Sequence, residues 1–413
     1  MKETRFKHTE IGQIPEDWVV ISLGDVGEVR MCKRIMKYQT AEKGDIPFFK
    51  ISTLGGRPDA FISRTIYESY KEKYNYPQSG DILLSAAGTI GRAVIFDGAP
   101  SYFQDSNIVW IENTESLLLN NLLYYIYRDL SWVTESGTIP RIYNSIVRSI
   151  NFPIPINIEE QSRIAAALTS VDDLISALDK LIEKKKNIKQ GSMQLLLTGK
   201  KRLKGLTDPW VEKQLGTMGC TFSGLTGKTK EDFGIGNARY ITFLNVLSNP
   251  ILKRGLFEEV VVREGEKQNS CHKGDLFFNT TSETPEEVGI CAVLDTEMES
   301  LYLNSFCFGY RLKDDRVVPE YLAYYFRSNE GRKMMTLLAQ GVTRYNISKY
   351  AFNKAKLLMP STALEQKAIV DVLKGIDKEI EALEIKKAKY EQVKQGMMQQ
   401  LLTGKIRLIE GPA

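Results

Sequence analysis

Side chains that bind nucleic-acid bases and phosphates recur at matching places in the two halves of this sequence. The first half reads "RIYN" at 141–144, and the second reads "RYN" at 344–346. Guanidinium groups bind phosphates and guanine edges, while amide and hydroxyl groups bind base edges. The glycines of "GTIGR" (88–92) and "SGLTGKTK" (223–230) let a backbone approach a phosphate closely. The chemistry that these residues predict is DNA binding, at one surface in each half.

The predicted DNA contacts are basic side chains together with hydroxyl and amide side chains. In the first half they are Lys33, Arg34, Lys50, Thr89, Arg92, Arg141, Tyr143 and Asn144. In the second half they are Thr226, Lys228, Thr229, Lys230, Arg239, Arg344, Tyr345 and Asn346. For any one of them, an exposed side chain that contacts only water is an equally good interpretation. The two sets are better supported than their members, because the Arg-Tyr-Asn group recurs at the same place in both halves.

The sequence lacks the motifs that catalysis would need. "SGLTGKT" (223–229) has Phe222 where a phosphate-binding P-loop requires glycine, and "TDPW" (207–210) lacks the second proline of the amino-methyltransferase motif. His8 and His272 are the only histidines, which leaves little material for acid–base catalysis or metal ligation. The cysteines at 32, 220, 271, 291 and 307 form no Cys-x-x-Cys pair. The sequence therefore predicts a chain that catalyses nothing by itself and holds no metal or cofactor of its own.

Length and charge allow a DNA-binding protein of two or three domains. The chain has 413 residues, of which 43% are hydrophobic, and a formal net charge of +4. So small a net charge permits nucleic-acid binding without requiring it, because basic residues can be concentrated on one face. No signal peptide and no apolar run of about eighteen residues is present. We therefore expect a cytoplasmic, reduced chain that does not contact a membrane.

A long internal repeat predicts two helices, which must hold the two DNA-binding surfaces. "KQGSMQLLLTGKKRL" (189–203) returns as "KQGMMQQLLTGKIRL" (394–408), with twelve of fifteen residues identical. The match continues upstream at a constant offset of 205 positions, where apolar residues follow the spacing 4, 3, 4, 3. This pattern predicts helices over 159–197 and 364–402, each about 58 Å long. Gly199 and Gly404 suit the left-handed position that follows a last helical turn.

The apolar seam of each helix occurs twice in the same register. One such seam is explained equally well by packing on an ordinary core, but two copies in one register favour helices that pair with each other. The seam residues are Ile164, Leu168, Val171, Ile175 and Leu178 in the first copy, and Ile369, Leu373, Ile376, Ile380 and Leu383 in the second.

The stretches before the helices, 14–155 and 207–360, are faintly alike. Each opens with a tryptophan phrase, and we expect Trp18 and Trp210 to have packing roles. β-Branched and aromatic residues form short runs that Gly, Pro, Asn and Asp interrupt, which predicts short strands with one or two helices. The expected fold class is α+β, with two strand-rich globules and two long helices in alternation.

The order of these phrases resembles that of a known family. The phrases are "EEQSRIAAAL" (159–168) and "LEQKAIVDVL" (364–373) in the helices, and "GDILLSAAGTIGR" (80–92), "YFQDSNIVWI" (102–111), "SGLTGKTKEDFG" (223–234) and "LNSFCFGYRL" (303–312) in the globules. Over essentially its whole length, the chain resembles the specificity subunits of type I DNA restriction–modification enzymes.

The resemblance implies four segments with separate roles. Residues 1–155 and 207–360 would be target-recognition domains, each of which reads one half of a split site in double-stranded DNA. Residues 156–206 and 361–413 would carry long helices that pair as an antiparallel coiled coil with an internal pseudo-two-fold repeat, and these helices would set the distance between the half-sites. The opening "KHTEIGQIPEDW" (7–18) would lie close to the tail after Leu408.

The resemblance also implies partners that supply the chemistry. Two modification subunits would dock on the helices and bring S-adenosylmethionine for adenine methylation. Restriction subunits would bring ATP and Mg²⁺ for translocation and cleavage. The DNA sequence that is read does not transfer, because the globules are the variable part of the family.

Two other functions stay open at this point. One is a single-chain, pseudo-dimeric DNA-binding regulator, which would bind its site tightly without partners. The other is a methyltransferase or nuclease with unrecognised motifs, which would be active when purified alone with S-adenosylmethionine or a divalent metal.

Overall fold

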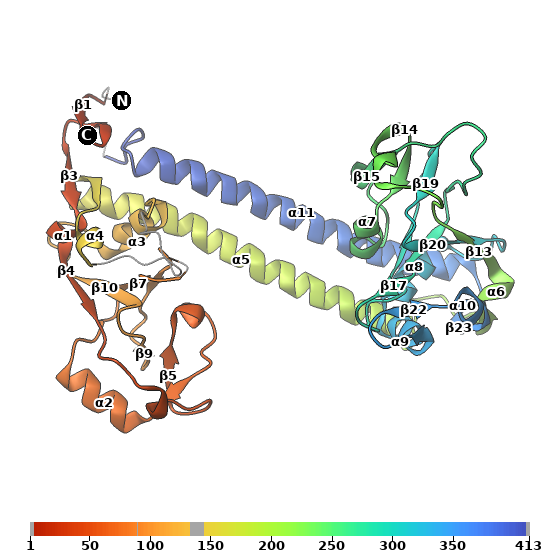
Figure 1. Cartoon of the computed structure of the whole chain (residues 1–413), viewed down its shortest axis with the longest axis horizontal. Helices are drawn as coiled ribbons and strands as arrows, with labels where there is room; N and C mark the ends of the chain where they lie inside the picture. The colour runs from red at the N-terminus through yellow and green to blue at the C-terminus, as the bar shows by residue number, and fades with distance from the viewer. Residues whose placement is uncertain (1–3, 89, 133–143, 410–413) are drawn as a thin grey trace. The chain divides into compact units, whose positions relative to one another are not determined.

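The computed structural model describes residues 4–88, 90–132 and 144–409. The chain divides into two compact units: residues 1–178 with 386–413 form unit 1, and residues 179–385 form unit 2. The long helices α5 (Ile158–Leu196) and α11 (Ala363–Leu401), yellow-green and blue in Figure 1, each contribute residues to both units. Each unit therefore contains one globule and part of each long helix.

The globule of unit 1 is built on a four-stranded sheet and a three-stranded sheet. The first has the order β4 (Gly27–Met31), β10 (Ile108–Asn113), β7 (Ile82–Ser85), β8 (Ala93–Ile95), and the second has the order β6 (Phe61–Ile62), β5 (Ile46–Phe49), β9 (Tyr102–Phe103). Two pairs complete the strands: β1 (Phe6–Thr9) with β2 (Gly12–Pro15), and β3 (Trp18–Ser22) with β11 (Asn151–Pro155). The helices are α1 (Leu23–Val26), α2 (Arg64–Lys73), α3 (Asn120–Asp129) and α4 (Asn144–Arg148), with 3-10 turns η1 (Lys37–Gln39) and η2 (Ile51–Thr53).

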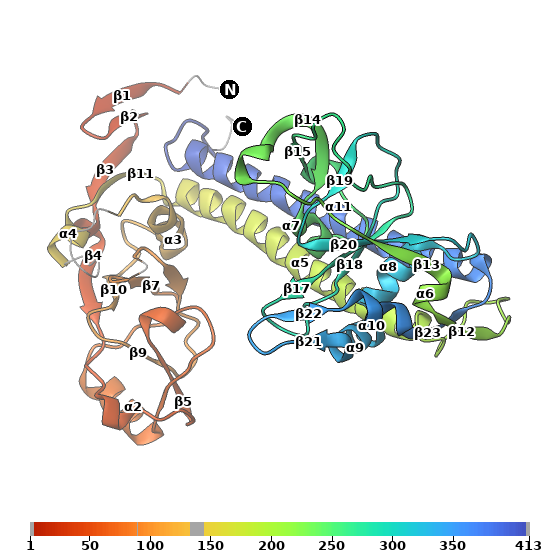
Figure 2. The same cartoon turned by 45° about the vertical axis from the view of Figure 1, so that its right-hand side comes forward.

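The globule of unit 2 repeats this order of strands. Its four-stranded sheet is β13 (Gly219–Ser223), β20 (Cys307–Leu312), β16 (Leu276–Asn279), β18 (Cys291–Val293), and its three-stranded sheet is β15 (Phe257–Val260), β14 (Phe233–Ile241), β19 (Leu301–Leu303). The pair β12 (Trp210–Gln214) and β23 (Lys356–Pro360) corresponds to β3 and β11. A further sheet joins β17 (Thr281–Ser282), β22 (Tyr345–Ile347) and β21 (Ala339–Gln340) (Figure 2). The helices are α6 (Leu215–Met218), α7 (Phe243–Ser248), α8 (Pro319–Arg327), α9 (Asn329–Leu338) and α10 (Lys349–Lys354), with η3 (Lys230–Asp232) and η4 (Arg254–Leu256).

The two long helices are confirmed, and each begins and ends one residue before the predicted bounds. Gly199 and Gly404 have φ angles of 69° and 68°, so both adopt the predicted left-handed conformation. A Cβ atom on either glycine would lie 3.3 Å from the nearest ring atom of Trp210 or Trp18. The packing roles expected for the tryptophans are thus confirmed, because each ring covers the glycine that ends a long helix.

The beginnings of the helix seams lie inside the globule cores. Ile164 and Leu168 are fully buried in the core of unit 1, together with Leu401 at the end of α11 and Leu402 directly after it. In unit 2 the core likewise contains Ile369, Leu373 and the end of α5. The remaining predicted seam positions are Leu178 and Ile380, both buried, and Val171, Ile175, Ile376 and Leu383, which are half-buried. These first positions therefore contact a globule as well as the other helix.

A glutamine near the start of each long helix joins that helix to its globule. In unit 1 the Gln161 amide donates to the carbonyl oxygens of Leu117 and Pro155 and accepts from the amide of Leu119, at 2.8–3.0 Å. In unit 2 the Gln366 amide donates to the carbonyl oxygens of Arg316 and Pro360 and accepts from the amide of Val318, at 2.7–3.2 Å. Both glutamine side chains are buried. In each unit the glutamine amide therefore satisfies the hydrogen-bonding groups of the loop, which are one backbone N–H and two carbonyl oxygens.

An arginine beyond each "LLTGK" phrase binds a buried glutamate. Arg407 pairs with Glu160 at 2.6 Å and also with Asp17 at 2.6 Å, so the N-terminal phrase lies close to the residue before Leu408. Residues 410–413 of the tail expected beside this phrase lie outside the described residues. Arg202 pairs with Glu365 at 2.5 Å in unit 2. Each glutamate side chain is 1% exposed, and a bidentate guanidinium is the group that best compensates a buried carboxylate.

Candidate nucleic-acid interface

The loop after β4 presents basic side chains in unit 1. The Lys33 ammonium group lies 5.3 Å from the centre of the Tyr74 ring. Arg34 is 65% exposed and pairs with Asp105 at 2.8 Å, which attaches the loop to the chain before β10. Both predicted side chains are exposed, and a phosphate could approach either of them.

The same loop contains two exposed residues that sequence reasoning missed. Lys37 and Tyr38 lie in η1, and the Tyr38 side chain is 84% exposed. The turn is ordered, because the Gln39 amide oxygen accepts from the backbone N–H of Met36 at 2.8 Å. In unit 2, η3 occupies the corresponding place after β13 and begins with Lys230. Aligning "KYQ" with "KED" at these turns is the sequence signal that could have identified Lys37.

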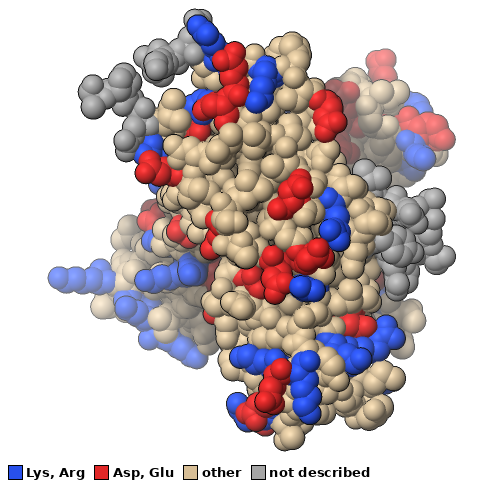
Figure 3. All heavy atoms as spheres, turned by 90° about the vertical axis from the view of Figure 1, so that its left-hand side faces the viewer, with Lys and Arg blue, Asp and Glu red and all other residues tan. Residues whose placement is uncertain are grey.

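The other predicted residues of unit 1 are spread over its surface. Lys50 pairs with Asp59 at 2.8 Å, and the exposed Arg92 donates to the carbonyl oxygen of Leu54 at 3.1 Å. Asn144 is exposed at the first residue of α4. Three predicted residues lie outside the described residues: Thr89, Arg141 and Tyr143. In Figure 3, lysine and arginine side chains gather at the lower end of unit 1, while acidic side chains are frequent across the middle of this face.

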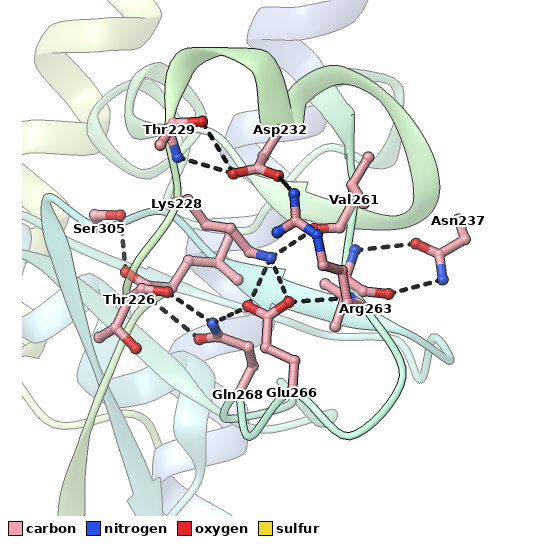
Figure 4. Close-up of polar contacts among 12 residues, drawn as sticks. Thr226, Lys228, Thr229, Asp232, Asn237, Val261, Arg263, Glu266, Gln268 and Ser305 are labelled. Carbon is pink, nitrogen blue, oxygen red and sulfur yellow. Dashed lines mark hydrogen bonds and ion pairs between the residues drawn. The ribbon is translucent and has the colours of Figure 1, made fainter.

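The loop "SGLTGKTK" of unit 2 is held by a network of internal hydrogen bonds and ion pairs (Figure 4). Lys228 is 1% exposed, and its ammonium group lies 2.6 Å from both the Glu266 carboxylate and the carbonyl oxygen of Val261. The hydrogen bond from Lys228, together with those from the Arg263 backbone and the Gln268 side chain, lowers the pKa of the Glu266 carboxyl to about 2. Lys228 therefore stabilises the loop from within. Its contact with DNA stays a prediction, and the buried position of its ammonium group does not favour that contact.

The flanking threonines of the loop are bound in the same way. Gln268 accepts from the backbone N–H of Thr226 and donates to its carbonyl oxygen, at 3.1 and 2.8 Å. Asp232 accepts from the Thr229 amide at 2.9 Å, and this bond is the main cause of the lowered pKa of its carboxyl. Arg263 binds the other oxygen of Asp232 at 2.8 Å. The loop is thus preformed, and Lys230 is the basic side chain that it leaves exposed.

Two further predicted groups of unit 2 lie on strands. Arg239 is exposed on β14, and Arg344 is exposed directly before β22. Within the described residues, neither guanidinium group has a hydrogen-bond or ion-pair partner: Arg239 bonds through its backbone N–H and Arg344 through its carbonyl oxygen. Tyr345 is half-buried on β22, whereas Asn346 is exposed. These positions leave the two guanidinium groups available to a ligand, while the exposed Asn346 amide donates to the carbonyl oxygen of Arg344 at 3.4 Å.

Backbone and side-chain hydrogen bonds connect the loop of unit 2 to the strand that carries Asn346. The Ser305 hydroxyl donates to the carbonyl oxygen of Leu225 at 2.8 Å. The Thr280 amide donates to the carbonyl oxygen of Phe306, and the Ile347 amide donates to that of Thr280, at 2.9 and 3.1 Å. The structure therefore places "SGLTGKTK" and "RYN", which are more than a hundred positions apart, within one connected part of unit 2.

Neither a membrane span nor a metal site is found in the described parts of the chain. Within residues 4–88, 90–132 and 144–409, no helix is long and apolar enough to cross a bilayer. In the same ranges, no cluster of three or more His, Cys, Asp or Glu side chains could hold a metal ion.

Comparisons with known proteins place this chain in a family. The family model described as "Type I restriction modification DNA specificity domain" matches residues 15–190 and 207–395. A protein of Haemophilus influenzae, provisionally named a type I restriction enzyme specificity subunit, is 52% identical over 178 residues, which cover 43% of this chain and 46% of that protein. The MjaVIII specificity subunit of Methanocaldococcus jannaschii is 25% identical over 445 residues, covering 98% of this chain and 97% of that protein.

Solved structures agree on the fold. The S subunit of a type I restriction–modification system from M. genitalium has a TM-score of 0.57 at 14% identity, covering 93% of this chain and 96% of its own. A chain from another structure, described as a study of complex assembly in the type I restriction–modification system, has the same TM-score at 16% identity and covers 95% of this chain and 99% of its own. Because the family model matches both repeats and most of the chain, this protein belongs to the family of type I restriction–modification DNA specificity subunits.

Proposed function

We propose that each globule of this DNA specificity subunit reads one half of a split site in double-stranded DNA. One observation carries the proposal: the two units have the same order of strands, but their corresponding loops present different side chains. At the turn after the first strand of each four-stranded sheet, unit 1 has Lys37 and Tyr38, whereas unit 2 has Lys230 and Glu231. A shared scaffold with different loops is what two readers of different sequences require.

The long helices are proposed to pair as an antiparallel coiled coil that sets the spacer between the half-sites. In unit 1, the support is an ion pair between Asp172 of α5 and Lys394 of α11. In unit 2, Lys185 pairs with Glu379 and Lys189 with Asp377, both at 2.5 Å. Residue numbers rise along one helix as they fall along the other, as expected for antiparallel helices. The buried Leu178 and Ile380 supply the apolar positions of the seam.

Chemistry is proposed to come from partner subunits. Two modification subunits would dock on the helices, each with S-adenosylmethionine, and restriction subunits would supply ATP-driven translocation and cleavage with Mg²⁺. The internal repeat supports two equivalent docking positions, because the repeated phrases at 189–203 and 394–408 are nearly identical. This chain would contribute sequence recognition and spacing, and no reacting group.

Methylome sequencing of cells with and without the gene tests the proposal. The expected result is a split motif with methylated adenines that disappears when the gene is deleted. Replacing residues 14–155 with the corresponding globule of a relative should then change one half of the motif only. An unchanged methylome after deletion would contradict the function, and a change in both halves would contradict independent reading. Robust methyl transfer by the chain purified free of partners would contradict a non-catalytic role.

A further inference from the structure

The hairpin formed by β21 and β22 is an ordered ribbon with an exposed tip. β22 is the central strand of its sheet, and Asn346 lies opposite Thr281 on one side and Gln340 on the other. Gly341 has a φ of 135°, and a Cβ atom there would lie 2.0 Å from the carbonyl oxygen of Arg344, so the turn is tight. In Figure 2 the hairpin loop points away from α9 and α10.

The base of the hairpin is fixed in the core of unit 2. Ile347 is 3% exposed, and a Cβ atom on Gly289 would lie 2.4 Å from its Cδ1 atom. Arg332 donates to the carbonyl oxygens of Gly289 and Glu286 at 2.9 and 2.8 Å, which holds the loop beside the hairpin. A rigid base lets the exposed part of the ribbon keep its shape when it meets a ligand.

One face of the ribbon is a row of hydrogen-bonding side chains. Side chains alternate along a strand, so Asn346 points away from the face of the buried Ile347, and Gln340 and Thr281 share its side because they lie opposite it. Gln340 and Asn346 are exposed. At the tip, the Val342 side chain is 89% exposed. The ribbon therefore offers amide groups next to a methyl-bearing tip.

We infer that this face enters the major groove of the half-site that unit 2 reads and contacts an A·T base pair. Val342 packs against the thymine methyl group, and the Gln340 amide hydrogen-bonds to the edge of adenine. The inference rests on the proposed function, and it names two residues and a base pair that the proposed function leaves open.

Three physical arguments support this ligand over others. The strand β17 pairs only with Tyr345 and Asn346, so the tip of the hairpin, residues 341–344, projects beyond it. The major groove admits such a two-stranded projection, and it displays the thymine methyl group and the N6 and N7 atoms of adenine, which amide side chains pair with. Val342 is 89% exposed and therefore buries little apolar surface in the free chain, whereas burial against a methyl group is favourable. The neighbouring Arg344, which lacks a side-chain partner within the described residues, supplies positive charge for the phosphates.

The test uses the complete complex with its modification subunits and the Val342→Ser variant. Each thymine of this half-site is replaced by uracil, which removes only the methyl group. Wild-type complex should lose about threefold to tenfold in DNA affinity at one thymine, as expected for one buried methyl contact. The variant should show the same loss on normal DNA and no further loss on the uracil-containing DNA. Leu337→Ser is the matched control, because Leu337 is 86% exposed nearby but outside the hairpin, and it should behave like wild type.

A second pair of substitutions tests the amide. Gln340→Met should weaken binding to normal DNA, and it should be insensitive to 7-deazaadenine at the same base pair, whereas wild type should be sensitive. The inference would be overturned if wild type and Val342→Ser bound every DNA with equal affinity. It would also be overturned if the variant bound more weakly than wild type by the same factor on thymine-containing and uracil-containing DNA. Failure of the variant to assemble with the modification subunits would also overturn it, because the hairpin would then be a protein contact. If wild-type complex showed no half-site preference at all, the proposed function itself would fail.

Discussion

Lys394 and Asp172 form an ion pair between α11 and α5 in unit 1, and Lys189 and Asp377 form the corresponding pair in unit 2. The offset of 205 positions converts each lysine into the other and each aspartate into the other. In both units a lysine near the end of one long helix thus binds an aspartate near the start of the other.

A tyrosine from each globule joins these pairs. The Tyr125 hydroxyl donates to Asp172 at 3.1 Å, and the Tyr324 hydroxyl donates to Asp377 at 2.7 Å. Each lysine ammonium group lies 5.7 Å from the centre of its tyrosine ring. The three groups connect α5, α11 and the globule at one point, so the aspartate is expected to be important for stability.

Asp172→Ala should lower the free energy of unfolding by about 2–4 kcal/mol, because it leaves a buried lysine without its partner. Asp377→Ala should lower the free energy of unfolding by less, because the lysine that it leaves unpaired is better solvated: the Lys189 side chain is 24% exposed, whereas that of Lys394 is 9% exposed. Urea unfolding of both variants measures the difference. The double variant Asp172→Leu with Lys394→Met should recover much of the loss. Equal and small effects of both single substitutions would contradict a stabilising role for these pairs.

Acid should loosen the "SGLTGKTK" loop. Hydrogen bonds from Lys228, which has the largest effect, and from Arg263 and Gln268 lower the pKa of Glu266 to about 2, below its ordinary value of 4.5. A carboxyl whose pKa is lowered by folding stabilises the fold above its unfolded pKa, and this contribution is lost as the pH falls from about 4.5 through about 2. An NMR titration of the Glu266 carboxyl carbon checks the value. Lys228→Met should return the pKa toward 4.5, and a wild-type value already near 4.5 would show that the pair is not formed.

The salt dependence of DNA binding should separate the two lysines of this loop. Lys230→Met should reduce the slope of log K against log salt by about one, as expected for one lost phosphate contact. Lys228→Met is the contrasting variant: it should weaken binding only by loosening the loop and should leave the slope unchanged, because the buried Lys228 ammonium group contacts no phosphate. Titrations of the assembled complex at several salt concentrations measure both. The opposite ranking would make Lys228 the phosphate contact.

Arg344→Ala should weaken binding to the half-site that unit 2 reads. If the guanidinium contacts a guanine edge, the loss should be about 1–3 kcal/mol and should depend on the base present. If it contacts only phosphate, the loss should be similar on every sequence, with a smaller salt slope. Competition binding with a panel of half-site variants distinguishes these results. An unchanged affinity on every DNA and an unchanged slope would leave Arg344 without a DNA contact.

Lengthening one long helix should lengthen the spacer of the motif. Seven residues inserted between Leu178 and Ile188 keep the apolar face in register and add about 10 Å, comparable to about three base-pair steps. The second helix is unchanged and can absorb part of this length, so a spacer longer by about one to three base pairs is expected, with both half-site sequences intact. Methylome sequencing reads the result. Two inserted residues would rotate the seam by about 200° and should abolish activity. An active protein with an unchanged spacer after the seven-residue insertion would show that the helices do not set the distance.

The long helices could be predicted because their signals are local: an apolar spacing of three and four, and a glycine after the last turn. The burial of Lys228 could not be predicted, because it depends on Glu266. That residue is 38 positions away, and no sequence motif identifies it as the partner of Lys228. Ile164 was predicted as a pairing residue, but the same apolar side chain also fills a globule core, and spacing cannot distinguish the two environments. The strands of the hairpin escaped prediction because they have only two or three residues each.

The hydrogen bonds by which Gln161 and Gln366 join the long helices to the globules have a consequence for how the sequence of a globule can change. Gln161 and Gln366 hold their globules through peptide groups, so the joint depends on the path of the backbone and is indifferent to the identities of the amino acids along it. A globule of a different sequence can therefore dock on the same helix, provided that its backbone forms a turn of the same shape. Substitutions in a globule can then change the DNA sequence that it reads, while the two long helices stay the same.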